Sequence, residues 1–188
     1  MVLLLASASP RRKALLSLLV NDFEVVDPDI DESLLPNESP LQYVERLSME
    51  KARRYAAADH VVLGADTTVA VGSSILGKPD SREAARAFLQ LLSGCTHEVH
   101  TALSLNIAGR TLTRAVTTLV TFAHLTEEAI TQYLTMDEYV GKAGAYAIQG
   151  YAGAFVSRIE GSYSAVVGLP LCETRELLLT ATIPVRYG

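Results

Sequence analysis

Three positively charged side chains stand directly after the first apolar segment of the chain, in the sequence SASPRRK at residues 7–13. Ser9 and Pro10 predict the start of a helix, because serine caps helix N-termini and proline is tolerated in the first turn. Cations there are unfavourable by about 0.3–1 kcal/mol each at low salt, since the helix dipole is positive at this end. Backbone N–H groups and two guanidinium groups could instead bind a phosphate. The sequence supports two interpretations of this segment equally, an anion-binding site and a solvated basic helix start.

A single carboxylate, Asp66, follows an apolar segment in VVLGADTT at residues 61–68. The pattern predicts a strand over 61–65 that ends abruptly at this aspartate. Ligand crevices of open α/β sheets lie at the carboxyl ends of strands. There Asp66 could hold Mg²⁺ against phosphate oxygens or accept a proton from an attacking water. An aspartate that closes a turn through its own backbone is the commoner meaning of this motif alone.

Two lysines lie close to acidic residues in the sequence. Lys51 is in the middle of a predicted helix, and Lys78 lies between a glycine and a proline, which fix its backbone and suit a ligand contact. An acidic stretch precedes that helix and contains Asp27, Asp29, Asp31 and Glu32. Oxygen ligands of this kind suit Mg²⁺ or Mn²⁺. For Asp27 and Asp29 we favour turn formation in a solvated loop.

A glycine-rich segment, GKAGAYAIQG at residues 141–150, offers a surface for a flat ligand. Small residues allow the backbone to approach such a ligand closely. The side-chain amide of Gln149 presents a donor and an acceptor in one plane, which matches the edge of a uracil or thymine ring. Without further information, a tight hairpin with an exposed glutamine is the better explanation of the segment.

Other residues that could do chemistry lack the partners they would need. His97 and His100 are three positions apart, which places them on opposite faces of a strand, so they cannot share a metal. Ser162 has neither a GxSxG context nor a paired histidine. Cys95 and Cys172 show no metal-binding spacing and are expected to be reduced thiols. Neither a Walker loop nor a GxGxxG motif occurs.

The elements that must position these residues follow from hydrophobic periodicity and capping signals. We expect strands at 2–6, 23–26 and 61–65, a hairpin of TTVAV and SSILG, and two long strands at 97–107 and 111–123. We expect helices at 10–20, 40–58, 81–92 (capped by Asp80 with Glu83), 126–135 and 171–180, with a hairpin within 141–170. This order favours an α/β fold with a mixed sheet, as one domain over residues 1–188.

Composition and charge narrow the class of protein. The 188 residues are 49% hydrophobic, which is enough for a sizeable core. The net charge of −5 argues against a nucleic-acid polymer as partner, since such proteins usually carry a basic surface. The apolar run at the start is short and its positive charges follow it, and no segment approaches a membrane span. We therefore expect a cytoplasmic protein, and the sequence leaves a homodimer open.

Taken together, the motifs resemble those of the Maf family of nucleoside triphosphate pyrophosphatases. The resemblance extends over nearly the whole chain. Its motifs are, in order, LASASPRRKALL, EKAR, VLGADTTV, ILGKP, LLSGCTHEVHTA, GKAGAYAIQG and GSYSAVVGLPL. Seven motifs in the family's order make a specific match, which no single one of them would.

The resemblance implies an elongated α/β fold similar to that of inosine triphosphatase, with two lobes and a central cleft. It also implies hydrolysis of a nucleoside triphosphate to the monophosphate and pyrophosphate with a divalent cation, Mg²⁺ or Mn²⁺. The family's catalytic aspartate corresponds to Asp66, as metal ligand or base, and its other acidic position corresponds to Asp31, with Glu32 beside it. Its phosphate-binding positions correspond to Ser7, Arg11, Arg12, Lys51 and Lys78. Its specificity positions correspond to Arg11, Thr67 and Gln149.

The form AYxIQG resembles the branch of the family that acts on dTTP and UTP, rather than the branch that acts on 7-methyl-GTP. Ala147 stands where close relatives have glycine, and it adds a methyl group near the expected base edge. The same motif is compatible with modified pyrimidine nucleotides as substrates. Two alternatives stay open, namely a nucleotide-binding regulator of septum formation and cell division, and a pyrophosphatase for non-standard purine nucleotides.

Overall fold

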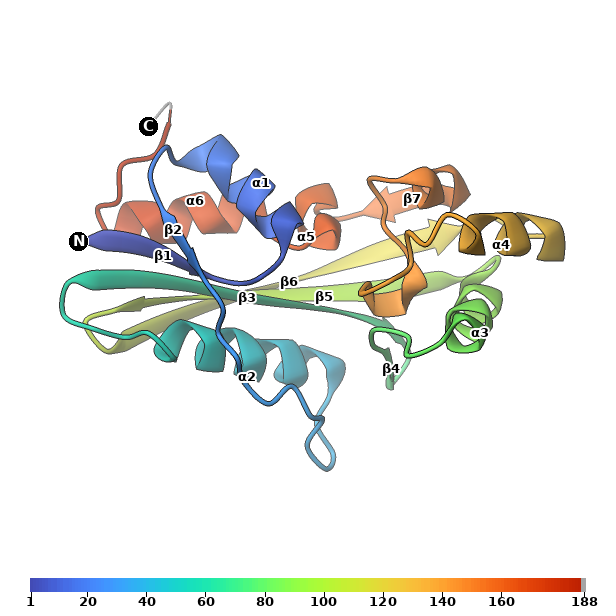
Figure 1. Ribbon diagram of the computed structural model, residues 1–188, viewed down its shortest axis with the longest axis horizontal. Helices are drawn as coiled ribbons and strands as arrows, with labels where there is room; N and C mark the ends of the chain where they lie inside the picture. Colours follow the sequence, from blue (N-terminus) through green and yellow to red (C-terminus); the bar gives the residue numbers. More distant parts are fainter. Residues whose placement is uncertain (187–188) are drawn as a thin grey trace.

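A single mixed sheet runs along the long axis of the molecule, and the computed structural model describes it within residues 1–186 (Figure 1). The strand order is β2-β1-β3-β5-β6-β7, and β4 pairs with β3. The strands are β1 (Val2–Ala6), β2 (Glu24–Val26), β3 (His60–Val71), β4 (Ser74–Leu76), β5 (Thr96–Ile107), β6 (Arg110–Phe122) and β7 (Val156–Glu160). β1 pairs in parallel with β2 and β3, and the remaining pairs are antiparallel. The predicted mixed α/β sheet is confirmed.

Helices cover both faces of this sheet. They are α1 (Pro10–Leu19), α2 (Pro40–Arg53), α3 (Arg82–Leu92), α4 (Glu127–Leu134), α5 (Tyr163–Val167) and α6 (Leu171–Thr180). In Figure 1, α1, α5 and α6 lie on one face and α2 on the other, while α3 and α4 lie at the far end beside β7. Within the described residues, no helix is long and apolar enough to cross a membrane.

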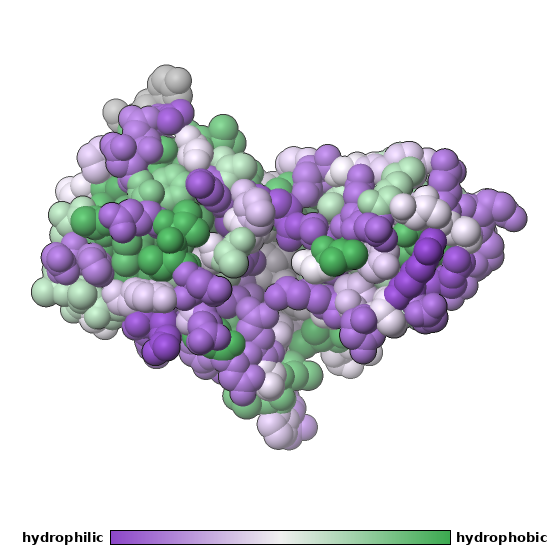
Figure 2. Space-filling model, viewed as in Figure 1, coloured by the Kyte–Doolittle hydropathy of each residue, from purple (hydrophilic) through white to green (hydrophobic). Residues whose placement is uncertain are grey.

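Two hydrophobic cores give the molecule its two lobes. One core packs α1 and α6 against the sheet, with Leu16 and Leu177 at its centre. The other gathers α3, α4 and the aromatic side chains of Phe122 and Tyr133 at the opposite end. Figure 2 shows the surface hollowed between the two lobes, with hydrophilic residues around the hollow. The predicted elongated, two-lobed shape is confirmed.

The helix starts follow the capping signals of the sequence in most places. Ser9 caps α1 and accepts a hydrogen bond from the N–H of Arg12. Ser39 caps α2, and Gln42 completes the reciprocal capping box. For α3 the cap is Ser81, whose side chain accepts from the N–H of Ala84, so the predicted cap at Asp80 is wrong by one residue. A serine hydroxyl is as good a capping group as a carboxylate, and sequence alone does not rank the two.

Three predicted elements differ from the structure. α2 ends at Arg53 rather than near residue 58, because residues 54–58 are exposed and would bury no apolar surface as a helix. β3 does not end at Asp66 but continues to Val71, since β5 pairs with it throughout. The predicted hairpin within 141–170 is absent from the described chain. That segment instead forms the short 3₁₀ turns Ala143–Ala145 and Tyr151–Phe155, followed by β7, which pairs with β6.

Helix α2 lies in very close contact with the sheet at Gly64. A Cβ atom at this position would overlap the carbonyl oxygen of Ser48 and lie 2.6 Å from the backbone nitrogen of Ala52, both in α2. The hydroxyl of Ser48 also bonds that of Ser104 in β5 at 2.8 Å, within the same buried contact. Gly64 therefore allows α2 to lie directly on the sheet, which sets the position of Lys51 on that helix.

We predict that Gly64→Ala lowers the free energy of unfolding by about 1–3 kcal/mol, because the added methyl group displaces α2. Urea denaturation measures the change. Gly77→Ala is the matched control, since a Cβ atom there meets nothing within 4 Å. Equal stability of the two variants would contradict this account of the helix contact.

Candidate active site

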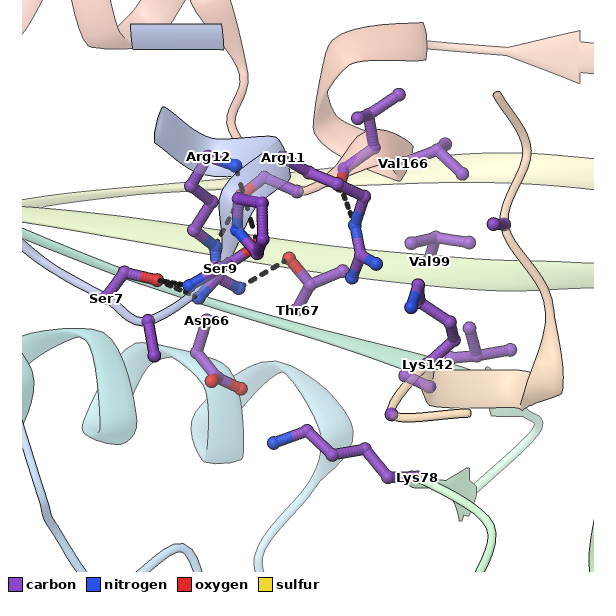
Figure 3. Close-up of a pocket in the computed structure, with 18 of the residues that line it drawn as sticks. Ser7, Ser9, Arg11, Arg12, Asp66, Thr67, Lys78, Val99, Lys142 and Val166 are labelled. Atoms are coloured by element: carbon purple, nitrogen blue, oxygen red, sulfur yellow. Dashed lines mark hydrogen bonds between the residues drawn. The ribbon is translucent and has the colours of Figure 1, made fainter. Parts of the chain in front are cut away.

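A cavity of about 410 Å³ lies between the two lobes and is lined by every predicted site residue except Asp31. Its walls come from the β1–α1 loop, the start of α1, the loop before α2, α2 itself, β3 and the loop at residues 140–149. The predicted residues that line it are Ser7, Arg11, Arg12, Glu32, Lys51, Asp66, Thr67, Lys78 and Gln149. Segments that are far apart in sequence thus meet around one space (Figure 3).

The cavity lies where β3 loses a strand partner. Pairing of β1 with β3 ends at Ala6 opposite Gly64, and pairing of β4 begins at Leu76 opposite Val69. Between these points, residues 65–68 of β3 pair only with β5, which leaves one edge of the strand open. Successive side chains of a strand point to opposite faces, so Asp66 and Thr67 serve two different sides of this opening.

The centre of the site is a buried ammonium group between two carboxylates. Nζ of Lys51 lies 2.6 Å from Oδ1 of Asp66 and 2.7 Å from Oε1 of Glu32. Nζ of Lys78 lies 3.0 Å from the other oxygen of Glu32. Partial burial alone would raise the pKa of Glu32, but the hydrogen bonds and charges of Lys51 and Lys78 outweigh it and lower the pKa to about 2. The Glu32 carboxylate therefore stays charged beside Asp66 at neutral pH.

Arg12 is fixed by hydrogen bonds from all three of its side-chain nitrogens. Nε donates to the carbonyl oxygen of Gly168 at 2.9 Å, Nη1 to the hydroxyl of Ser7 at 3.3 Å and Nη2 to the hydroxyl of Thr67 at 3.2 Å. Burial lowers the pKa of Arg12, and the negative charges of Asp66 and Glu32 act in the opposite direction. The guanidinium group is thus a rigid positive charge that joins the start of α1 to β3.

Arg11, the next residue in the helix, is held far less tightly. Its Nε donates to the carbonyl oxygen of Val167 at 3.3 Å, and within residues 1–186 its terminal nitrogens have no hydrogen-bond partner. Burial and the neighbouring charge of Arg12 lower its pKa. The two arginines were predicted together as phosphate-binding residues, but the structure gives them different surroundings.

Thr67 and Gln149, the other predicted specificity residues, differ in their freedom to contact a ligand. The hydroxyl oxygen of Thr67 accepts from Arg12 and from Thr101, the latter at 3.0 Å. Gln149 is exposed at the rim of the cavity, after the buried residues Ala147 and Ile148. The amide of Gln149 can therefore turn towards a bound molecule.

Asp31 is the predicted site residue that the structure does not bring to the cavity. Its exposed carboxylate accepts a hydrogen bond from the backbone N–H of Ser33 at 2.9 Å. Hydrogen bonding by the side chain of Ser33, and then by its backbone, lowers the pKa of Asp31. Asp27 forms a similar turn with the N–H of Asp29, as the sequence predicts, although Asp27 also borders the cavity. Between the adjacent acids, Glu32 rather than Asp31 faces the lysines.

The donor set at the cavity centre fits a divalent cation bound together with phosphate oxygens. Within the described residues, no group of three or more histidine, cysteine or acidic side chains could hold a metal by itself. Mg²⁺ is commonly held by one or two carboxylates together with substrate phosphates and water. Asp66 and Glu32 supply two carboxylates on the same ammonium group, so a bound phosphate chain would have to complete the coordination.

A buried histidine supports the cavity wall from behind. Nε2 of His97 lies 2.8 Å from the hydroxyl of Tyr146, which lines the cavity, and both rings pack edge-on against Phe122. Burial lowers the pKa of His97 to about 4, so its ring is neutral near pH 7. His100 instead bonds Thr117 on the opposite face of the sheet, which confirms that the two histidines cannot share a metal.

Sequence reasoning missed Lys142, which also lines the cavity. Its Nζ donates to the carbonyl oxygen of Val140 at 2.9 Å. Burial and the charge of Arg11 lower its pKa, and the charge of Glu138 acts in the opposite direction. Its position in the glycine-rich segment GKAGAY is the signal that could have identified it.

Comparison with known proteins places these motifs in one family. The family described as "Maf-like protein" matches residues 2–181. The dTTP/UTP pyrophosphatase of Escherichia coli is 51% identical over 94% of this chain and 91% of its own length. Proteins of the same name from Hahella chejuensis and Bacillus cereus are 49% and 47% identical, over 94% and 93% of this chain and 90% and 93% of their own lengths. A HAM1 protein structure from Coxiella burnetii covers 66% of this chain and 75% of that one with 15% identity and a TM-score of 0.47, too distant a likeness to support an argument.

The ion cluster predicts a specific pH dependence of stability. Because the pKa of Glu32 is about 2 in the folded protein and its ordinary value is 4.5, its contribution is present above pH 4.5 and is lost as the pH falls towards 2. We expect Glu32→Gln to destabilise the protein by about 1 kcal/mol more at pH 6 than at pH 3.5, allowing for solvent screening of this half-buried group. Urea unfolding at both pH values measures the difference, with Glu24→Gln on the exposed edge of β2 as control. A loss that is the same at both pH values would contradict the assignment.

Proposed function

The chain belongs to the Maf family, and on that premise we propose that it is a pyrophosphatase that hydrolyses dTTP and UTP to the monophosphate and pyrophosphate. The observation that carries the proposal is the buried cluster of Asp66, Lys51 and Glu32, which shares one cavity with Arg12 and Lys78. The relatives named dTTP/UTP pyrophosphatase, among them those 51% and 49% identical to this chain, support the choice of substrates.

In the proposed reaction a water oxygen attacks the α-phosphorus in line with the leaving group. The bond between that phosphorus and the oxygen that bridges to the β-phosphorus breaks, and pyrophosphate leaves with the bonding electron pair. Asp66 accepts the proton of the water or orients it. Lys51 contacts Oδ1 of this carboxylate, so Oδ2 is available for the water. The carboxylate is held in position by the same ammonium group that would face the phosphates.

The cations stabilise charge that grows on the leaving pyrophosphate. Lys51, Lys78 and Arg12 come from three different segments and are already oriented, so little reorganisation is needed when the bond breaks. A divalent cation held by Asp66 and Glu32 would supply Lewis-acid chemistry by neutralising charge on the phosphate oxygens. Ser7 lies where its hydroxyl orients Arg12 towards the same space.

We predict that Asp66→Asn lowers kcat for pyrophosphate release from UTP and dTTP by about 10²–10⁴-fold, because the amide cannot accept the proton. The affinity for UTP should change little, since the positively charged side chains that bind the phosphates remain. Stopped assays of pyrophosphate release and calorimetric titration with UTP measure the two quantities. Asp22→Asn, at an exposed position before β2, serves as control. If both binding and full turnover survive in Asp66→Asn, the assigned role is wrong.

A competition among UTP, dTTP, 7-methyl-GTP and ITP tests the proposed substrates. We expect kcat/KM for UTP and dTTP to exceed that for the two purine nucleotides by about ten-fold or more, because Gln149 matches the edge of a pyrimidine with two carbonyl groups. Equal rates for all four would contradict the pyrimidine preference. Tight binding of UTP without pyrophosphate release would indicate a nucleotide-binding regulator instead.

A further inference from the structure

Three cations in the cavity, Arg11, Arg12 and Lys142, have no carboxylate partner within the described residues, and two of them, Arg11 and Lys142, also leave side-chain donors unused. Arg11 uses only Nε, in a bond to Val167, and Lys142 uses one donor, in a bond to Val140. By contrast, Lys51 and Lys78 are paired with carboxylates, and all three nitrogens of Arg12 donate. The free hydrogen-bond donors of the cavity are therefore concentrated at Arg11 and Lys142.

These two residues lie at the apolar end of the cavity. Figure 3 shows the heads of Arg11 and Lys142 close together beside Val99 and below Val166, while Asp66 lies on the far side of Thr67. Val69 and Ile148 add further apolar lining to the cavity. The cavity thus has one end rich in paired charges and another with valine walls and unpaired donors.

Neighbouring cations in an apolar pocket are unfavourable without a ligand. Burial chiefly, and then the charge of Arg11, lower the pKa of Lys142, while the charge of Glu138 acts in the opposite direction. A ligand group that offers acceptor oxygens to both residues would relieve the repulsion between the two cations. The cations around Asp66 already provide for the phosphate chain, and the valine walls suit a flat ring. The group expected here is therefore a base that carries carbonyl oxygens.

We propose that Lys142 is a further specificity-determining residue, which acts with Arg11 by donating hydrogen bonds to the carbonyl oxygens of a pyrimidine base. The proposal rests on the proposed function and deepens it. Uracil and thymine present two carbonyl acceptors, whereas the amino group of cytosine is a donor and would face these donors unfavourably. Lys142 thereby favours a base with carbonyl groups at both positions.

The loop that carries Lys142 is held firmly in place. The N–H of Gly144 donates to the carbonyl oxygen of Gly77, beside Lys78, at 3.2 Å. Gly144 also packs directly on Val69, where a Cβ atom would come within 2.8 Å of the valine methyl group. Ala145 adopts a left-handed conformation with φ +61°, which only a well-packed loop tolerates. Lys142 is therefore presented to the ligand without a large ordering cost.

Calorimetric titration of Lys142→Met with UMP, CMP and pyrophosphate tests the proposal without requiring turnover. We expect about ten-fold weaker binding of UMP, and little change for CMP and pyrophosphate, because one charged hydrogen bond to the base is lost. Lys142→Arg should recover most of the affinity for UMP. Lys13→Met, which removes an exposed lysine of α1 outside the cavity, is the control and should bind all three as the unmodified protein does.

Weakened pyrophosphate binding with unchanged UMP binding would overturn the proposal and place Lys142 among the phosphate-binding residues. An equal loss for UMP and CMP would also overturn it, because the carbonyl preference would then lie elsewhere. Failure of the proposed function is a separate result. It would appear as absent pyrophosphate release by the unmodified protein, whereas the binding comparison among UMP, CMP and pyrophosphate would still report on Lys142.

Discussion

The site depends on one interaction, the contact of the Lys51 ammonium group with the carboxylates of Asp66 and Glu32. Asp66 and Glu32 come from different segments, and a shared cation offsets the repulsion between two neighbouring carboxylates. A buried ion pair is costly to form, so its value here lies in geometry rather than in net stability. That geometry requires α2 to lie on the sheet, which is possible because Gly64 has no side chain. A glycine in the core thus determines where Lys51 meets Asp66.

The position of the cavity follows from the sheet rather than from any one motif. β1 is short, so β3 continues past it and exposes one edge over residues 65–68. The alternation of side chains then sends Asp66 towards α2 and Thr67 towards α1 and α5. A ligand that lies across this edge meets charged groups on one side and the valine-lined space on the other. The division of a nucleotide into phosphates and base matches this division of the cavity.

Much of the fold could be predicted from sequence because its signals are local. The caps at Ser9 and Ser39, the long hairpin of β5 and β6, and the helix over 171–180 each depend on neighbouring residues. The predicted elements are wrong where the structure depends on pairing between strands that are far apart in the sequence. The continuation of β3 beyond Asp66 depends on β5, and the pairing of β7 depends on β6. The site residues were found mainly through family resemblance, which gives positions but no contacts, so it could not separate Glu32 from Asp31.

Arg11 and Arg12 show why contacts matter for function. In sequence they are equivalent, but adjacent positions of a helix point about 100° apart. Arg12 therefore turns towards Ser7 and Thr67, where all its side-chain nitrogens are engaged. Arg11 turns towards Lys142 (Figure 3), and its terminal nitrogens have no partner among residues 1–186. A guanidinium group with satisfied bonds contributes a fixed charge, which acts on any polyphosphate regardless of its base. A group with unsatisfied donors gains energy only from a ligand with matching acceptors. Discrimination between nucleotides must then come from groups with unsatisfied donors.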